Sequence, residues 1–284
     1  MKIITMRNEE DEIQVLGNSS KKRKNGLLIW VILVGILMLV GVIFLIFHTR
    51  KNPVVLEDGI KKQVESMLVS DSLCNDIIQK ESRILITNDT INDVSLKIYS
   101  LINLRAELSI GWPQVDDDLY MAVEAADIRK DNGEILGDYV IKGKQIARGK
   151  RKSGYVAIIE GNILMGNSIT DEVKDYCTEH QGDFFRQYIL VADGEVAENK
   201  LKGKALRRAL AQQGDNLFFI ESTQRESLYD FSEGMADMGI TNAIYLTGGE
   251  AYGIYKDEEG DLHELGVSER LKRENTNFLI FRKK

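Results

Sequence analysis

A Gly-Gly pair directly after a buried strand pattern is the part of this sequence best suited to contact a ligand. Thr247, Gly248, Gly249 and Glu250 follow the apolar run 243–246 at once. Glycine has no Cβ, so the backbone there can approach a ligand closely, and groups at strand exits often serve function. Gly-Gly pairs also mark ordinary hairpin turns. The stretch therefore indicates either a ligand-facing loop or a plain turn.

Asp127 and Arg207 are the other side chains whose type and position suggest chemistry. Asp127 follows the apolar run 119–125, and a carboxylate there either exchanges a proton with a ligand or caps a turn. Arg207 stands just before the apolar run 209–211. A guanidinium holds phosphate or carboxylate through two parallel hydrogen bonds, although arginines more often lie solvated at a surface. The acids 116–118 are interpreted as a solvated turn rather than a cation site.

Short strands must position these groups. From Trp112 onward, brief apolar runs alternate with Gly, Asn and Asp turns, which is typical of strands. Asp193-Gly194 predicts a hairpin between two of them. The expected strands are 119–125, 137–141, 155–159, 188–192, 217–220, 243–246 and 277–281.

Two helices are expected among the strands. Asp171 and Glu172 fall in the first turn of 170–180, where acids complement the helix dipole. Ser227 is a suitable N-cap for 227–238. The intermixed helices and strands predict an α+β fold, a mixed sheet flanked by helices.

A long apolar segment near the N-terminus predicts one transmembrane helix. Residues 26–47 contain no charge and are long enough to cross a hydrocarbon core of about 30 Å. No polar face and no small-residue cleavage site accompany them. The basic residues 21–24 outnumber Arg50 and Lys51 on the other side. This bias predicts a cytoplasmic tail over 1–25 and a membrane-anchored chain whose later residues lie outside the cytoplasm, in the periplasm or at the cell surface.

The segment between the membrane and the domain is expected to be helical. Apolar residues recur at helical spacing near 60–68 and again over 94–108. These patterns predict a helical stalk or linker over 48–110, which leaves 111–284 as the folded domain.

Composition excludes some function classes. The chain has 284 residues and a formal charge of −7, and without a basic stripe no nucleic-acid partner is expected. Its three histidines are scattered, so no metal site and no cofactor are expected. Whether Cys74 and Cys177 form a disulfide stays open, because sequence does not supply the geometry a bridge requires.

Four segments, taken in order, resemble a known enzyme family. They read AADIRKDNGEILGDYVIKG from Ala125, QGDFFRQYILVADG from Gln181, RRALAQQGDNLFFI from Arg207 and MGITNAIYLTGGEAYG from Met238. The phosphodiester glycosidase family, which includes enzymes that remove N-acetylglucosamine from phosphodiesters, carries A-x-N-G-G-F-F, G-x-x-L-V-x-D-G, R-T-A-I-G and L-N-L-D-G-G-G-S-S in this order. The resemblance covers about 119–284.

The resemblance carries some positions over and departs at others. Asp127 falls on the family's Asn, and Arg207 falls on its Arg. Gly248-Gly249 falls on its Gly-Gly pair, whereas Thr247 replaces the Asp before it. Glu250-Ala251 replaces the family's small Gly-Ser-Ser tail, and the Gly-Gly-Phe-Phe turn is absent from residues 128–132.

The resemblance implies hydrolysis of a sugar-1-phosphodiester or related glycoside, with a glycan or sugar phosphate as the ligand. Glycoside cleavage commonly uses two carboxyl groups as general acid and base, and Asp127 and Glu250 are the candidates. The other interpretation is a non-catalytic cell-envelope protein of the same fold that binds a glycan or a partner protein. The residues expected to bind substrate or its phosphate are Arg207, Thr247, Gly248 and Gly249.

Overall fold

The computed structural model divides the chain into two compact units, Met1–Glu57 and Asp58–Lys284. Nearly all described residues belong to the second unit. The predicted tail 1–25 lies outside the described residues, and so does the predicted membrane helix 26–47 apart from Met38. In the part of the chain that is described, no helix is long and apolar enough to span a membrane. The structure describes residues 38, 61–66, 81–149, 152–268 and 274–284.

The second unit is dominated by β-structure, with strands and helices intermixed as the sequence predicts. The expected single sheet is instead three sheets, and every strand pair among the described residues is antiparallel. Antiparallel strands can be joined by short hairpins, which explains how turns such as Asp193-Gly194 connect neighbouring strands.

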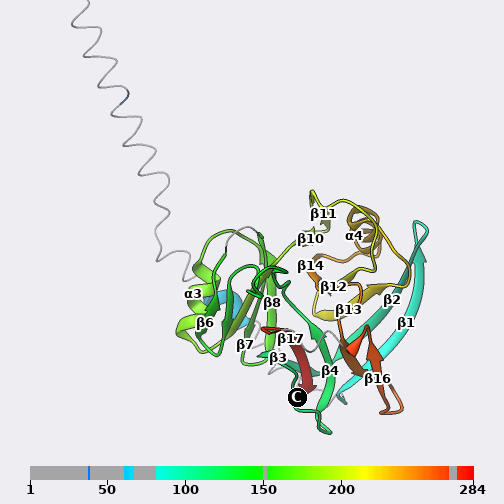
Figure 1. Cartoon of the computed structure of the whole chain (residues 1–284), viewed down its shortest axis with the longest axis horizontal. Helices are drawn as coiled ribbons and strands as arrows, with labels where there is room; N and C mark the ends of the chain where they lie inside the picture. Colours follow the sequence, from blue (N-terminus) through cyan, green and yellow to red (C-terminus); the bar gives the residue numbers. More distant parts are fainter. Residues whose placement is uncertain (1–37, 39–60, 67–80, 150–151, 269–273) are drawn as a thin grey trace, which may run out of the picture. The chain divides into compact units, whose positions relative to one another are not determined.

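The first sheet has seven strands in the order β1-β2-β13-β12-β14-β10-β11. Helix α4 (Leu228–Asp237) packs on one face, where Phe231 and Met235 join the apolar side chains of the strands (Figure 1). Ser227 caps α4 by accepting a hydrogen bond from the Asp230 N–H at 3.0 Å, as predicted. The strands are β1 (Arg83–Ile91), β2 (Val94–Ile102), β10 (Ile189–Ala192), β11 (Glu195–Val196), β12 (Arg208–Gln213), β13 (Asn216–Ser222) and β14 (Asn242–Leu246).

The second sheet has five strands in the order β16-β15-β4-β17-β3. Its last strand in the chain, β17, lies between two strands that come much earlier, β4 and β3. The strands are β3 (Leu104–Ile110), β4 (Leu119–Glu124), β15 (Gly253–Lys256), β16 (Leu262–Leu265) and β17 (Asn277–Lys283).

The third sheet also has five strands, in the order β6-β5-β9-β7-β8. Helix α3 (Glu172–Glu179) covers it through Val173 and Cys177, and Val64 from the helical residues 61–66 joins the same apolar cluster. The strands are β5 (Tyr139–Ile141), β6 (Lys144–Ala147), β7 (Gly154–Ile159), β8 (Asn162–Asn167) and β9 (Asp183–Gln187).

One hydrophobic core joins all three sheets. Tyr99 and Phe219 come from the first sheet, Tyr255 and Phe281 from the second and Phe185 from the third. The Tyr99 ring lies 5.2 Å from that of Phe219 and 4.9 Å from that of Tyr255, measured between centroids. Each such side chain contributes roughly 1.5–3 kcal/mol when buried, so the sheets depend on one another for stability.

The predicted helical linker over 94–108 is wrong. These residues form β2 and β3, and β1 precedes them, so the domain begins well before residue 111. Val94, Leu96 and Ile98 are buried while the residues between them are half-buried, a period of two that belongs to a strand. The parts of the predicted stalk at 48–60 and 67–80 lie outside the described residues.

Candidate functional site

The candidate residues gather where strand ends of the sheets meet. The Thr247 N–H, just after β14, donates to the Ala125 carbonyl, just after β4, at 3.2 Å. The Tyr245 N–H donates to the carbonyl of Tyr188, between β9 and β10, at 2.9 Å. Segments far apart in the sequence thus meet through backbone hydrogen bonds, and their side chains meet as well.

Asp127 is held between a lysine and a threonine. Lys152 Nζ donates to Asp127 Oδ2 at 2.7 Å, and Thr247 Oγ1 lies 3.3 Å from Asp127 Oδ1. The lysine ammonium also lies over the ring of Tyr188, 4.9 Å from its centroid. A carboxylate so placed can accept hydrogen bonds on one oxygen while the other neutralises a buried cation.

The Gly-Gly turn predicted from the sequence is present, and backbone hydrogen bonds hold it in place. The Gly249 N–H donates to the Leu206 carbonyl at 3.0 Å, and the Glu250 carbonyl accepts from Val267 N–H at 3.1 Å. A Cβ added at Gly248 would lie 2.7 Å from the Leu206 oxygen and 3.3 Å from the Tyr245 hydroxyl. Gly248 is therefore required by the close approach of the chain's own Leu206 carbonyl, whereas the approach of a ligand to this turn stays a prediction.

Arg207 comes just before β12 and lies beside the Gly turn, but its side chain is anchored to backbone. It is 6% exposed, and its Nε and Nη2 donate to the carbonyls of Glu226 and Gly203 at 3.0 and 2.7 Å. Its positive charge also lowers the pKa of the Tyr245 phenol, against the larger effect of burial. The guanidinium is thus fixed in place beside the Gly turn.

The pKa values of two groups at the candidate site, Lys152 and Tyr245, are shifted by burial and by neighbouring charges. Burial lowers the pKa of Lys152, while the charge of Asp127 and its hydrogen bond act in the opposite direction. Burial raises the pKa of Tyr245, the charge of Asp127 raises it further, and Arg207 lowers it. The Tyr245 hydroxyl therefore lies within the fields of both an anion and a cation. Perturbed groups of this kind concentrate at functional sites.

The structure brings some predicted site residues together and leaves one apart. Asp127, Arg207, Thr247 and Gly248 surround Tyr245 and Lys152 as described. Glu250 is exposed at the tip of the turn, and its position is fixed through its backbone carbonyl rather than its carboxylate. The charged partner of Asp127 among the described residues is the ammonium of Lys152. Roles for these residues remain predictions.

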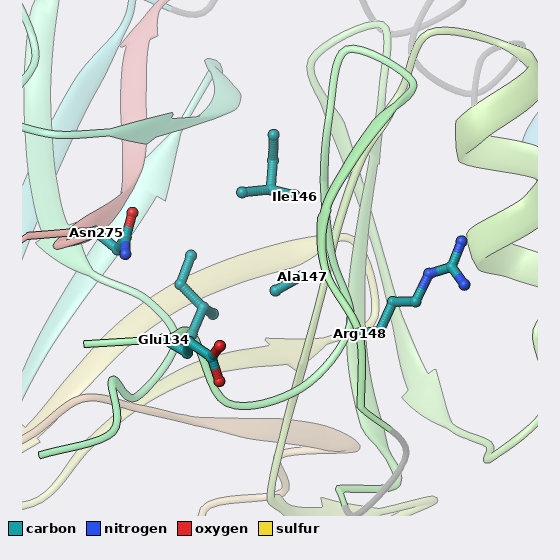
Figure 2. Close-up of a pocket in the computed structure, with 6 residues that line it drawn as sticks. Glu134, Ile146, Ala147, Arg148 and Asn275 are labelled. Atoms are coloured by element: carbon teal, nitrogen blue, oxygen red, sulfur yellow. The ribbon is translucent and has the colours of Figure 1, made fainter. Parts of the chain in front are cut away.

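A shallow cavity of about 290 Å³ lies beside the loop that carries Asp127. Figure 2 shows Glu134, Ile146 and Asn275 around this space, with the Arg148 side chain extending away. Ile135, which lines the cavity, forms an isolated β-bridge with Ile128, the residue after Asp127. The Leu136 N–H donates to the Asp127 carbonyl at 2.8 Å. The volume of this cavity is at the lower end of the range for small-molecule sites.

Sequence reasoning missed Lys152, Tyr188 and Tyr245. Lys152 belongs to a basic run, 148–152, and such runs usually lie in solvent; its 5% side-chain exposure is a tertiary property. Tyr245 lies inside the predicted strand 243–246, where an aromatic side chain is normally assigned to the hydrophobic core. The one available signal was that a tyrosine hydroxyl, when buried, needs a partner.

The comparisons with known proteins show a distant fold relationship. No family model and no curated protein sequence matches the chain. Among solved structures, the chain is similar to the zebrafish N-acetylglucosamine-1-phosphodiester alpha-N-acetylglucosaminidase catalytic domain auto-inhibited by its pro-peptide. Identity is 14% and the TM-score is 0.51, over 72% of this chain and 83% of that one.

A second solved structure, a hypothetical protein from Synechocystis, is similar at 11% identity with a TM-score of 0.51. The match covers 71% of this chain and 62% of that one, so this chain spans less than two thirds of its length. At these identities the likenesses show the fold alone. The sheet-dominated domain thus shares its architecture with a glycosidase catalytic domain.

Proposed function

We propose that the chain is a membrane-anchored, extracytoplasmic phosphodiester glycosidase-like protein that hydrolyses a sugar-1-phosphodiester or related glycoside. One observation carries the proposal: Thr247, at the start of the Gly turn, hydrogen-bonds the Asp127 carboxylate, and Arg207 is fixed beside the same turn, its Cα 3.6 Å from where a Cβ of Gly248 would stand. A carboxylate and a fixed cation at one place are the groups that cleavage next to a phosphate requires.

Each residue has a role in this proposal. Arg207 and the backbone of Gly248 hold the phosphate, whose negative charge the guanidinium neutralises, and Gly249 supports this turn through its hydrogen bond to Leu206. Asp127 acts on the attacking water, and Thr247 orients its Oδ1. Glu250, exposed on the same turn, is the second carboxyl group available to a bound sugar. The distant fold relationship to a glycosidase domain supports this assignment.

Hydrolysis is tested with the full-length chain in detergent and a panel of sugar-1-phosphodiesters. Release of free sugar is expected, and Asp127→Asn and Arg207→Lys should each lower it at least tenfold. Asp193→Asn, in the hairpin at the far end of β10 from Tyr188, and Arg83→Lys, exposed on β1, are matched controls. No release from any member of the panel would contradict the catalytic proposal.

A specific observation favours the second candidate, a non-catalytic glycan- or partner-binding envelope protein. Asp127 and Arg207 are already engaged by the chain itself, through Lys152 and through the carbonyls of Gly203 and Glu226. Groups held in this way keep their charges and positions, which suits electrostatic binding of a ligand more than proton transfer to it. Saturable binding of a sugar phosphate without release of free sugar would decide for this candidate.

The membrane anchor is part of the proposal and rests on the uncharged run 26–47 and its basic flank. A reporter active only outside the cytoplasm, fused after Lys284, should be active. A reporter that works only in the cytoplasm, fused at the same place, should be silent. The reverse pattern would overturn the proposed orientation.

A further inference from the structure

Lys152 is a buried lysine whose ammonium contacts the Asp127 carboxylate. The side chain of Lys152 is 5% exposed, that of Asp127 is 28% exposed, and their charged atoms are 2.7 Å apart. The ammonium also faces the Tyr188 ring. The second carboxylate oxygen, Oδ1, lies against Thr247 Oγ1. One oxygen of Asp127 therefore faces a cation, and the other faces the Gly turn.

This arrangement makes the charge of each group depend on the other. Taking an ammonium out of water is costly, and a close carboxylate and an aromatic face offset that cost. Among the described residues, the other charged or titratable groups here include Tyr188, against the ammonium, and Arg207 and Tyr245, on the side of the Gly turn. Removal of the lysine would leave a partly buried carboxylate without its adjacent counter-charge, which destabilises the folded chain wherever that carboxylate is ionised.

We propose that Lys152 is the positioning residue of this site: it compensates the charge of the Asp127 carboxylate and holds Oδ2, so that Oδ1 stays beside Thr247 and accepts a proton from a ligand or water. The coupling of Lys152 to Asp127 stands on the geometry alone. Its consequence for a reaction rests on the proposed function.

In that reaction, Asp127 takes a proton from water as the water oxygen bonds to the sugar carbon. The carbon–oxygen bond to the phosphate breaks, and its electron pair leaves on the phosphate oxygen. A phosphate is a weak base and departs as an anion without prior protonation, while Arg207 neutralises its charge. The proton on Asp127 passes to solvent. One carboxylate base beside a cation is therefore sufficient, and a carboxylic acid is not needed.

The coupling is tested by the melting temperature of the full-length chain in detergent between pH 4 and pH 8, read by tryptophan fluorescence. The variants are Lys152→Met, Asp127→Asn and the double variant. The loss of melting temperature in Lys152→Met should be small near pH 4, where a lone carboxylate is protonated, and should grow by several degrees as pH rises. The double variant should show a loss that does not change with pH.

Two outcomes would overturn the proposal. In the first, Lys152→Met lowers the melting temperature by the same amount at every pH. In the second, the double variant lowers the melting temperature by the sum of the two single losses. Lys152→Arg keeps the charge and should abolish the pH dependence. If Lys152→Met unfolds at pH 7.5, it should fold at pH 4.5, and failure at both values also counts against the coupling.

A binding measurement separates this inference from the proposed function. Inorganic phosphate is titrated into the full-length chain at pH 7.5 by calorimetry. Lys152→Met should bind about tenfold more weakly, because the uncompensated carboxylate repels the anion, and the double variant should recover most of that loss. Unchanged affinity in Lys152→Met contradicts the inference. Failure of the natural chain to bind phosphate contradicts the anion role of the site, while the melting series still decides the coupling.

Discussion

Thr247 Oγ1 lies 3.3 Å from Asp127 Oδ1 and at the same distance from the Ala125 carbonyl. The contact joins the residue after β14, in the first sheet, to the segment after β4, in the second. The two strand ends are therefore tied by side chain and by backbone, since the Thr247 N–H also donates to the Ala125 oxygen. Substitutions at this junction test both the fold and the site.

Gly248→Ala should destabilise the domain more than Gly249→Ala. A Cβ at Gly248 meets the Leu206 oxygen at 2.7 Å, and that oxygen is held by a backbone hydrogen bond; crowding of this kind costs about 1–3 kcal/mol. Gly249 has a φ of 68° and nothing within 4 Å of an added Cβ, so only the left-handed backbone penalises alanine, by about 1 kcal/mol. Thermal unfolding measures both, and equal losses would contradict the packing described at Gly248.

Arg207→Ala should lower both stability and phosphate affinity. Arg207 is 6% exposed and its Nε and Nη2 hydrogen-bond two carbonyls, and loss of hydrogen bonds from a charged group costs about 1.5–3 kcal/mol. Arg207→Lys restores the charge but not the planar fork. Lysine should therefore recover part of the phosphate affinity in calorimetry and little of the melting temperature. Full recovery of both by lysine would show that the carbonyl contacts are unimportant.

Cys177 should resist alkylation in the folded domain. Burial raises the pKa of its thiol to about 12, so only roughly one molecule in ten thousand carries the reactive thiolate at pH 8. In a Cys74→Ser chain, iodoacetamide followed by mass spectrometry should label Cys177 only after denaturant is added. Rapid labelling under native conditions would show that the cluster around α3 opens readily.

The second compact unit, Asp58–Lys284, should fold without residues 1–57. Within it, Val64 is 2% exposed and packs with Val140, Val173 and Phe184, so Val64→Ala should cost about 1–3 kcal/mol. Lys61→Ala is an exposed control on the same helical segment. Chemical denaturation of the truncated chain measures both variants. An unfolded truncated chain would show that residues 1–57 contribute to the fold.

Much of the strand pattern is predictable because it is local. The expected strands from 119–125 to 277–281 and both expected helices are present, since apolar runs bounded by turn residues or caps specify them. The helical prediction for residues 94–108 was wrong because their apolar residues fit a helical pattern and an alternating pattern alike. The decisive local signal was Asn92-Asp93, both at positive φ, which is the turn of a β-hairpin.

The candidate site was predictable only where a residue type carried its own signal. Asp127, Thr247 and Gly248 stand at strand exits, and the structure brings them together. The partner of Asp127 is a lysine, Lys152, and nothing local distinguishes a buried lysine from its solvated neighbours. Glu250 looked equivalent to Asp127 in sequence, yet the turn leaves it exposed. Burial and pairing arise from contacts distant in the chain.

The position of β17 between β3 and β4 has a consequence for synthesis. Among the described strands, the partners of β4 are β15 and β17, which the ribosome makes more than a hundred residues later. While the chain is being translated, β3 and β4 are therefore without their shared neighbour, and their backbone groups have to be protected in another way. Assembly of this sheet therefore waits until residues up to Lys283 have emerged, so the sheet cannot form step by step as its earlier strands are synthesised.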